Sequence, residues 1–422
     1  MFGVLKKLFT NTPPEPVKPL YYDIVCPYCF SKFHHEKVVF RAAHHREDDE
    51  TFHLQEDDKL NQYRAKFGLA PIDELEAWID PSTIADENKL YSDNVLVGIS
   101  DRYSVMTRNR LCPECHNDLP VTAGKYPSNI ISIVGATSVG KSVYITSLIR
   151  TLQRVTAGNF EAACLPLNNS ISRRFRDEYE IPLFESGNLF EATATTKRQE
   201  PFIFQFVFKN DDRAPLTLVF FDVAGEGMTQ KDYLQLHASH IKNSAGILFL
   251  VDPIQIRAIR EKMIYQMGEN PGKIVGLADE PREVVISLFE DFISQQENSK
   301  TNIPTAVVLT KSDLLHALSS DEGEYIQSNS NVFRNVIHRG FLNINEFENI
   351  NGEIKRFLSK VDIPFVDAVD VYFKDTAYFA VSALGSNPVN QQVNGIISPI
   401  RVDEPFIWLM YKLGYIEGRQ EQ

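Results

Sequence analysis

A glycine-rich loop between a predicted strand and a predicted helix constrains the fold more than any other feature. The pattern Gly135-x4-Gly140-Lys141-Ser142 follows an apolar, β-branched run at 129–134, and residues 143–150 continue as a helix. The glycines let the loop curl with its backbone N–H groups pointing inward, and the helix N-terminus adds partial positive charge. This strand–loop–helix unit predicts a phosphate-binding loop, or P-loop.

The residue types of the loop assign its contacts with a nucleotide. We expect Lys141 to reach the β- and γ-phosphates, and we expect the Ser142 hydroxyl to bind Mg2+. The predicted phosphate-binding set is Gly135, Ser138, Val139, Gly140, Lys141, Ser142 and Val143. Lys141 is also a predicted catalytic residue, because it faces charge that develops on the γ-phosphate.

Downstream of the loop, short apolar runs alternate with longer amphipathic stretches. The runs lie at 129–134, 216–221, 246–251, 305–309 and 378–381, which is typical of strands buried on both faces. A further candidate at 201–208 has four phenylalanines at period two and is expected at a sheet edge. The sequence predicts an α/β fold: a doubly wound, mostly parallel six-stranded sheet with helices on both faces, the last helix lying near 405–413.

Two later strand ends carry residues that bear on the phosphates and the base. Asp222 ends the strand at 216–221 and can hold Mg2+, and Gly225 lets a backbone N–H approach the γ-phosphate. The strand at 305–309 leads into Thr310-Lys311-Ser312-Asp313. The Asp313 carboxylate can accept the N1–H and the 2-amino group of guanine, a donor pair that adenine lacks. The stem of Lys311 can cover the purine face.

The last predicted strand completes the base site. It leads into Ser382, Ala383 and Leu384, where a backbone N–H can bind guanine O6. Ligands of such sheets bind at the carboxyl ends of the strands, where all four elements lie in order. Residues 128–385 therefore resemble the translation-factor-related class of P-loop GTPases, which includes the Ras-like proteins. The resemblance implies GTP and GDP as ligands, Mg2+ as cofactor, and hydrolysis of GTP.

The chain departs from that class in three ways. Thr310 stands where Asn is commoner, and Glu226 stands where Ras-like enzymes place the Gln that orients the attacking water. Glu226 is still a predicted catalytic residue, with Gly225, but hydrolysis is expected to be slow. The domain is also enlarged near 155–200, 254–300 and 315–375. A switch I threonine for Mg2+ is expected before residue 201, with Thr196 preferred over the alternatives Thr195 and Thr193; Arg198 is a weaker candidate for an arginine finger.

Two Cys-Pro-x-Cys pairs precede the P-loop. Cys26, Cys29, Cys112 and Cys115 resemble the knuckles of a zinc ribbon, and four thiolates would form a closed, structural Zn2+ site. The 82 residues between the pairs indicate an insertion, at 30–111. Alternatives are free thiols, a redox pair, or ligation by histidines of the insertion, namely His34, His35, His44 and His45. A helix is also possible within the insertion, near 71–79.

The net charge and the first residues of the chain bear on which partners and which location are expected. The net charge is −13, and residues 1–127 hold 20 acidic and 15 basic side chains, so nucleic acid is not the expected partner. No apolar run reaches 18 residues, and the first ten residues lack a signal-peptide core, so a cytoplasmic location is expected. The amphipathic start from Met1 to Phe9 gives only a weak membrane signal.

These observations predict three parts: a tail and linker at 1–16, a zinc-ribbon module with its insertion at 17–125, and a GTPase domain at 126–422. The expected function is a regulatory GTPase that acts as a nucleotide-dependent switch for a protein partner. Alternatives are a nucleotide-binding scaffold with little hydrolysis, and an RNA- or ribosome-associated GTPase that uses the ribbon. The ribbon-plus-GTPase layout also resembles some bacterial regulatory GTPases, including ones in defence systems. The sequence does not fix an oligomeric state.

Overall fold

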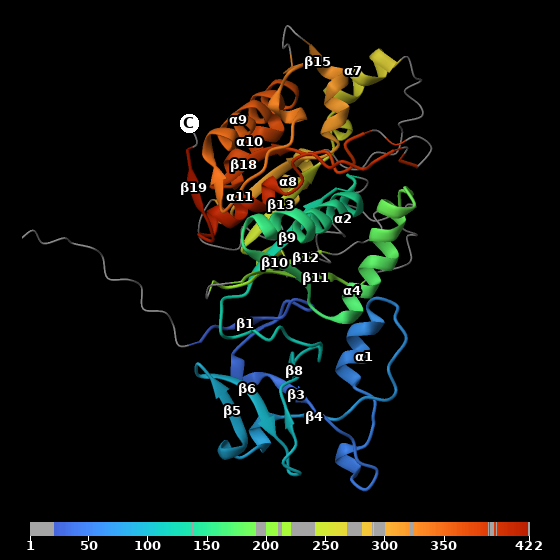
Figure 1. Cartoon of the computed structure of the whole chain (residues 1–422), viewed down its shortest axis with the longest axis vertical. Helices are drawn as coiled ribbons and strands as arrows, with labels where there is room; N and C mark the ends of the chain where they lie inside the picture. The colour runs from blue at the N-terminus through green and yellow to red at the C-terminus, as the bar shows by residue number, and fades with distance from the viewer. Residues whose placement is uncertain are drawn as a thin grey trace, which may run out of the picture.

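A computed structural model describes residues 21–136, 139–190, 200–209, 213–220, 241–267, 281–288, 290, 300–320, 325–386, 388, 392–393 and 395–420. Figure 1 shows an N-terminal module, coloured blue to cyan, at one end of the long axis. A large sheet with its helices occupies the other end.

The large sheet has the strand order β10-β11-β12-β9-β13-β14-β18. The bounds are β9 Asn129–Gly135, β10 Ala162–Pro166, β11 Phe202–Phe208, β12 Leu216–Phe220, β13 Gly246–Val251, β14 Thr305–Leu309 and β18 Thr376–Ala380. Five strands, from β12 to β18 in this order, are parallel, and β11 runs antiparallel to both of its neighbours, β10 and β12. The α/β fold class is confirmed.

The sheet has one strand more than the six predicted. β10 pairs with β11 along its whole length, with Cys164 opposite Phe206, so the edge strand is β10 rather than β11. This pairing explains why β11 can be so apolar: Phe202, Phe204, Phe206 and Phe208 are all buried. The lone Cys164 is also buried, and burial raises the pKa of its thiol to about 12.

Helices cover both faces of the sheet. Every residue of β13 is buried, and successive side chains of a strand point to opposite faces, so neither face is open there. The helices are α2 Lys141–Thr151, α3 Ala157–Asn159, α4 Asn169–Phe175, α7 Arg257–Met267, α8 Pro281–Leu288, α9 Ile344–Val361, α10 Ile363–Tyr372 and α11 Glu404–Lys412. α2 is joined to the segment just before α11, where the buried Tyr144 hydroxyl donates to the carbonyl of Val402, 3.1 Å away.

The N-terminal module is built from short strands. β1 Ile24–Val25 and β2 Lys32–Phe33 form a hairpin, and a three-stranded sheet has the order β4-β3-β8 (Trp78–Ile79, Val39–Arg41, Arg110–Leu111). A second sheet contains β5 Lys89–Ser92, β6 Val95–Ser100 and β7 Met106–Thr107. The one α-helix described here is α1, Asp58–Ala65. The helix predicted near 71–79 is therefore wrong: Leu75 bridges to Gln55, and Trp78 and Ile79 pair with β3.

The module packs directly on the sheet domain. The Val25 N–H donates to Ser128 Oγ at 3.1 Å, and Asn168 Nδ2 lies 3.4 Å from the Tyr28 hydroxyl. Asn243 Nδ2 lies 3.4 Å from the carbonyl oxygen of Phe30. Buried apolar side chains of the module and of the sheet form one continuous core.

Smaller pairs of strands lie outside the main sheet. β15 Ser319–Ser320 pairs with β16 Ile326–Gln327, and β17 Phe341–Asn343 pairs with β19 Glu417–Arg419. Among the helices described, none is long and apolar enough to cross a membrane.

Candidate functional site

The P-loop follows β9 at the position predicted. A β-carbon on Gly135 would lie 2.9 Å from the carbonyl oxygen of Leu250, so only glycine fits where β9 ends against β13. Gly140 has φ +82° and starts α2, a conformation that favours glycine. The side chain of Lys141 is buried and donates to the Gly135 carbonyl at 3.1 Å, so it folds back over the loop. Ser142 lies in the first turn of α2, and Thr137 and Ser138 are outside the described residues.

Thr310 connects the end of β14 to the P-loop. Its side-chain hydroxyl lies 3.0 Å from the carbonyl oxygen of Val139 and 3.1 Å from that of Val251. Thr310 is buried, so this hydroxyl is held away from solvent. A threonine therefore makes the strand-to-loop contact at the position where the related GTPases usually have Asn.

Lys311 lies beside the P-loop and is held by an acid that sequence reasoning missed. Its ammonium lies 2.5 Å from Asp252 Oδ2, at the end of β13. Its Cε would lie 3.6 Å from a β-carbon on Gly140, so the aliphatic stem runs next to the loop. Asp252 is almost fully buried. Asp252 could have been found in the sequence as an acid directly after an entirely apolar strand.

Asp313 and Ser382 meet although 69 residues separate them. Ser382 Oγ donates to Asp313 Oδ1 at 2.6 Å and accepts from the Gly385 N–H at 2.9 Å. Ser147 on α2 donates to the carbonyl of Ala383 at 2.7 Å, a second contact that the sequence did not indicate. Leu384 packs in a small apolar cluster against which Val143 also rests. The ends of β9, β14 and β18 are thus joined by hydrogen bonds into one site.

Besides Ser138, four predicted members of this site lie outside the described residues: Thr196, Asp222, Gly225 and Glu226. The other switch I candidates, Thr193 and Thr195, and Arg198, also lie outside them. Their assigned roles stay predictions.

The two cysteine knuckles have the same backbone geometry. The N–H of Cys26 donates to the Ser31 carbonyl at 3.0 Å, and that of Cys112 donates to the Asn117 carbonyl at the same distance. The residues after the second cysteines, Phe30 and His116, both have positive φ, 59° and 51°. Each turn therefore directs its pair of sulfur atoms to the same side.

The four sulfur atoms form a cluster that fits a tetrahedral metal. All four lie within 4.8 Å of one another, with 3.7 Å between Cys26 and Cys115 and 3.6 Å between Cys29 and Cys112. Zinc bound at about 2.3 Å would separate its sulfur ligands by about 3.8 Å. Burial first, and then the neighbouring thiols, raise the pKa of Cys26 well above its usual value. A bound cation would offset that cost, because metal-bound thiols are deprotonated.

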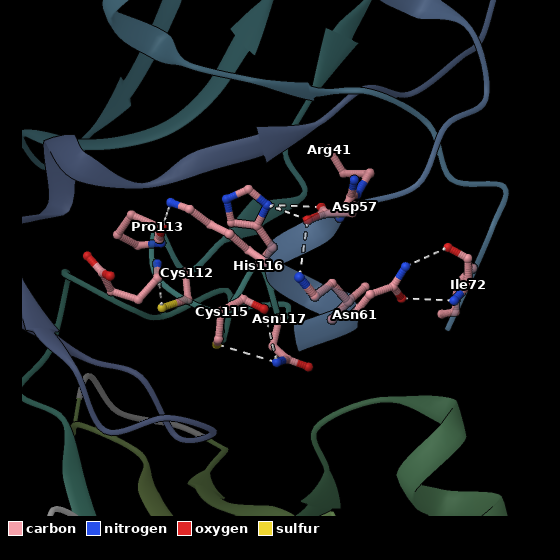
Figure 2. Close-up of polar contacts among 12 residues, drawn as sticks. Arg41, Asp57, Asn61, Ile72, Cys112, Pro113, Cys115, His116 and Asn117 are labelled. Carbon is pink, nitrogen blue, oxygen red and sulfur yellow. Dashed lines mark hydrogen bonds and ion pairs between the residues drawn. The ribbon is translucent and has the colours of Figure 1, made fainter. Parts of the chain in front are cut away.

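The second knuckle is anchored to α1 by a buried acid, as Figure 2 shows. His116 Nδ1 lies 2.9 Å from both carboxylate oxygens of Asp57, and Arg41 donates to Asp57 Oδ2 at 2.6 Å. Asp57 also caps α1 by accepting from the Leu60 N–H. Burial raises the pKa of Asp57, but the hydrogen bonds from His116 and Arg41 outweigh it and lower that pKa to about 2. The insertion is thereby tied to the cysteine cluster.

The histidines considered as alternative ligands lie elsewhere. The rings of His34 and His35 contact each other at a tilt near Tyr21, and His44 stacks on Phe52. Within the described chain, the candidate metal-binding group contains the four cysteines alone. None of the five cysteines forms a disulfide, and Ser31 Oγ, 3.0 Å from Cys29 Sγ, adds a hydrogen bond to the cluster.

Known proteins share parts of this chain. It is 26% identical over 332 residues to the "Putative ESX-1 scaffolding and assembly protein SaeC" of Mycolicibacterium smegmatis, an alignment that covers 72% of this chain and 80% of the relative. Two solved structures overlap with TM-scores of 0.29. The Arl6 (BBS3) small GTPase of Trypanosoma brucei is 13% identical, with 67% of this chain and 96% of that one covered. The Ski7 GTPase-like domain of S. cerevisiae is 14% identical, with 68% and 51% covered.

Residues 129–354, more than half of the chain, match the family described as double-GTPase 2. The match starts at β9 and the P-loop and extends through the Thr310–Asp313 motif into α9. The chain is therefore a GTP-binding GTPase and belongs to the double-GTPase 2 family.

Proposed function

We propose that this GTPase is a nucleotide-dependent switch that reports its GTP- or GDP-bound state to a protein partner. The observation that carries the proposal is the hydrogen bonding of three strand ends into one site, through Thr310 with Val139 and Asp313 with Ser382. A change at the phosphates can therefore act on elements that are linked to the rest of the sheet.

The base would be read by residues at the ends of β14 and β18. Asp313 Oδ1 accepts from Ser382, so the carboxylate is oriented before a nucleotide binds. It would accept the N1–H and the 2-amino group of guanine. The stem of Lys311 would cover the purine face, with its ammonium fixed by Asp252. A backbone N–H near Ala383 would bind O6.

The phosphates would lie against the P-loop and the start of α2. Lys141 would exchange its bond with the Gly135 carbonyl for bonds with the β- and γ-phosphates. Ser142, Asp222 and Thr196 would hold Mg2+, and the ion would neutralise charge that develops on the phosphate oxygens. The hydroxyl of Ser142 lies in the first turn of α2, where the helix dipole also favours an anion.

Hydrolysis would proceed by attack of water on the γ-phosphate. Glu226 follows Gly225 in the position next to that phosphate. A carboxylate can accept a proton from water, but its negative charge opposes the phosphate, so we propose a slow intrinsic rate. Single-turnover hydrolysis by Glu226→Gln is expected to be faster than by wild type, and Lys141→Ala is expected to abolish it.

The zinc-ribbon module would supply the partner surface. We propose the boundaries 1–16 for the tail, 17–125 for the module and 126–422 for the GTPase domain. The module would hold one structural Zn2+ through Cys26, Cys29, Cys112 and Cys115, as the sulfur spacing supports. One of its contacts with the sheet domain is at Asn243, which follows the proposed switch segment 221–240 closely in the chain.

A protein is the proposed partner rather than nucleic acid. The relative from Mycolicibacterium is named as a scaffolding and assembly protein, which supports a role among proteins. The net charge of −13 disfavours a sequence-independent grip on RNA. We propose a reducing, cytoplasmic location, because four of the five cysteines cluster as metal ligands do.

Hydrogen exchange tests the switch directly. Protein loaded with GDP is compared with protein loaded with a non-hydrolysable GTP analogue, and exchange is followed in 191–199, 221–240 and the module. The proposal predicts slower exchange of both segments with the analogue, and altered exchange around Asn168 and Phe30. Equal exchange in the two states would leave a nucleotide-binding scaffold as the better description.

A further inference from the structure

An insertion between the two guanine motifs contacts the first of them. The ring of Phe333 stacks on the ring of His316, with centroids 3.7 Å apart and planes tilted by 18°. His316 belongs to the short 3-10 helix Ser312–Leu318, which also contains Asp313. The insertion therefore packs against the element that presents the proposed base-selecting acid.

Two residues further along the insertion, Asn335 holds another segment by its backbone. Its side-chain Nδ2 donates to the carbonyl of Pro399 at 2.8 Å, and its Oδ1 accepts from the N–H of Arg401 at 2.8 Å. One amide thus satisfies both a donor and an acceptor on the 399–401 backbone. This geometry fixes the segment in both position and direction.

The segment held by Asn335 is paired with the second guanine motif. Ser382 and Ile400 exchange backbone hydrogen bonds at 3.0 and 2.8 Å, and the Ser398 N–H donates to the Leu384 carbonyl at 3.0 Å. A β-carbon on Gly385, which has φ +79°, would lie 2.2 Å from the Ser398 carbonyl oxygen. The loop that carries Ser382 therefore packs too closely on this segment to move without it.

Arg401 anchors the same segment in the interior. It is almost fully buried, and its Nε donates to the carbonyls of Asn331 and Arg334 at 3.0 and 2.9 Å. Its remaining guanidinium nitrogens pair with Glu404, at 2.7 Å, and with Glu346. The insertion, α9 and α11 are thus all tied to a residue next to Ile400.

We propose that residues 331–335 are a clamp that positions both guanine loops, with Asn335 and Phe333 as its positioning residues. This inference rests on the proposed roles of Asp313 and Ser382 in base recognition. The hydrogen bond between those two side chains spans the two loops, so its geometry depends on their separation. Holding both loops from one insertion reduces the entropy lost when guanine binds.

The test compares variants by their affinity for GDP and by their preference for guanine over hypoxanthine nucleotides. Inosine nucleotides lack only the 2-amino group, so the GTP-to-ITP affinity ratio reports how well Asp313 is placed. Asn335→Ala is expected to raise the Kd for GDP about three- to ten-fold, the effect of losing neutral hydrogen bonds, and to lower the GTP-to-ITP ratio. Phe333→Leu is expected to act in the same direction.

A matched control lies in the same insertion. Asp362 Oδ1 accepts from the Phe365 N–H at 3.1 Å and caps α10, so Asp362→Ala loses a comparable bond that does not reach a guanine loop. It should lower the melting temperature without changing the GTP-to-ITP ratio. The single-turnover rate of bound GTP should also stay at the wild-type value in this control variant, because neither a guanine loop nor the phosphate site is touched.

Asp313→Asn distinguishes a failure of the proposed base site from a failure of the clamp. If it leaves the base preference unchanged, the proposed base site itself is wrong. If it changes that preference while Asn335→Ala and Phe333→Leu keep the wild-type GTP-to-ITP ratio, the base site stands and the clamp is refuted. A drop in melting temperature with no change in the ratio would likewise reduce the insertion to a purely structural role.

Discussion

The hydroxyl of Thr310 lies 3.0 Å from the carbonyl oxygen of Val139 and joins the end of β14 to the P-loop across 171 residues of sequence. Threonine offers a single donor here, and the hydroxyl is shared with the carbonyl of Val251. The phosphate loop and the base-recognition motif are therefore held together by one small side chain. This link makes Thr310 a test of how strongly the two halves of the nucleotide site depend on each other.

Thr310→Val should weaken nucleotide binding with little change in volume. Loss of a buried hydroxyl contact leaves two carbonyl oxygens with one partner fewer, so the Kd for GTP should rise about two- to ten-fold. Titration with a fluorescent guanine nucleotide measures this. Thr310→Ser keeps the hydroxyl and should bind nearly as wild type, and equal affinities for the Val variant and wild type would show that the link does not support binding.

Asp252→Asn should loosen Lys311. The substitution removes the charge that holds the ammonium but keeps an oxygen that can still accept from the Ile254 N–H. Because Lys311 is partly exposed, we expect GDP dissociation to accelerate only about three- to ten-fold. Stopped-flow displacement measures the rate. The difference in GDP dissociation rate between wild type and Asp252→Asn should become smaller at high salt. A difference that does not depend on salt would point to a cause other than the ion pair.

Zinc should be present at one ion per chain and should stabilise the N-terminal module. Metal analysis of the purified protein, followed by thermal unfolding with and without a strong chelator, tests this. Cys115→Ala should lose the metal and lower the melting temperature, because three thiolates leave the tetrahedral site open. Cys164→Ala is the control, since Cys164 lies in β10 away from the cluster. Metal-free protein that melts as cooperatively as the untreated sample would contradict the assignment.

Glu404 should make stability depend on pH in the acid range. Burial raises the pKa of its carboxyl, but His338, whose Nε2 lies 3.5 Å from Glu404 Oε1, and the charge of Arg401 outweigh burial and lower that pKa. A lowered folded-state pKa means that the stabilisation is present above the unfolded-state pKa, about 4.3, and is lost as pH falls through the folded-state value. Glu404→Gln should cost about 1.5–3 kcal/mol in the free energy of unfolding at pH 7.

Urea unfolding of wild type and Glu404→Gln at several pH values checks the direction of this pH dependence. The difference in the free energy of unfolding between wild type and Glu404→Gln should become smaller as the pH is lowered towards 3, because the wild-type carboxyl then takes up a proton. A difference that stays constant over this range would mean that the ionised form of Glu404 does not contribute.

The nucleotide site was readable from the sequence because its residues follow strands buried on both faces. The strands at 246–251 and 305–309 were predicted with the bounds that β13 and β14 have, and β9 ends one residue later than predicted. Apolar, β-branched runs leave little choice of structure. Asp252 and Ser147 were missed because their importance lies in their partners, Lys311 and Ala383, and not in a local pattern.

The N-terminal module was less readable for a physical reason. α1 buries only Tyr63 and begins at the Asp57 cap, so its sequence has no apolar stripe from which a helix could be predicted. Residues 71–79 have helix-forming composition, but pairing with Gln55 and β3 overrides that propensity. β10 was missed because it is short and half-exposed, and its pairing with β11 is what makes it a strand. Tertiary partners decided each of these elements.

The most direct measurement of the central claim is the base preference of wild type and Asp313→Asn, determined as Kd values for GDP, XDP and ADP under identical conditions. The base of XDP is xanthine, which carries a carbonyl where guanine has its 2-amino group. The side-chain amide of Asp313→Asn can donate a hydrogen bond to this carbonyl, whereas the wild-type carboxylate should repel it. We predict that wild type binds GDP at least about a hundred-fold more tightly than XDP or ADP, and that Asp313→Asn reverses the order of GDP and XDP. Equal preference in the two proteins, or tighter binding of ADP by wild type, would contradict it.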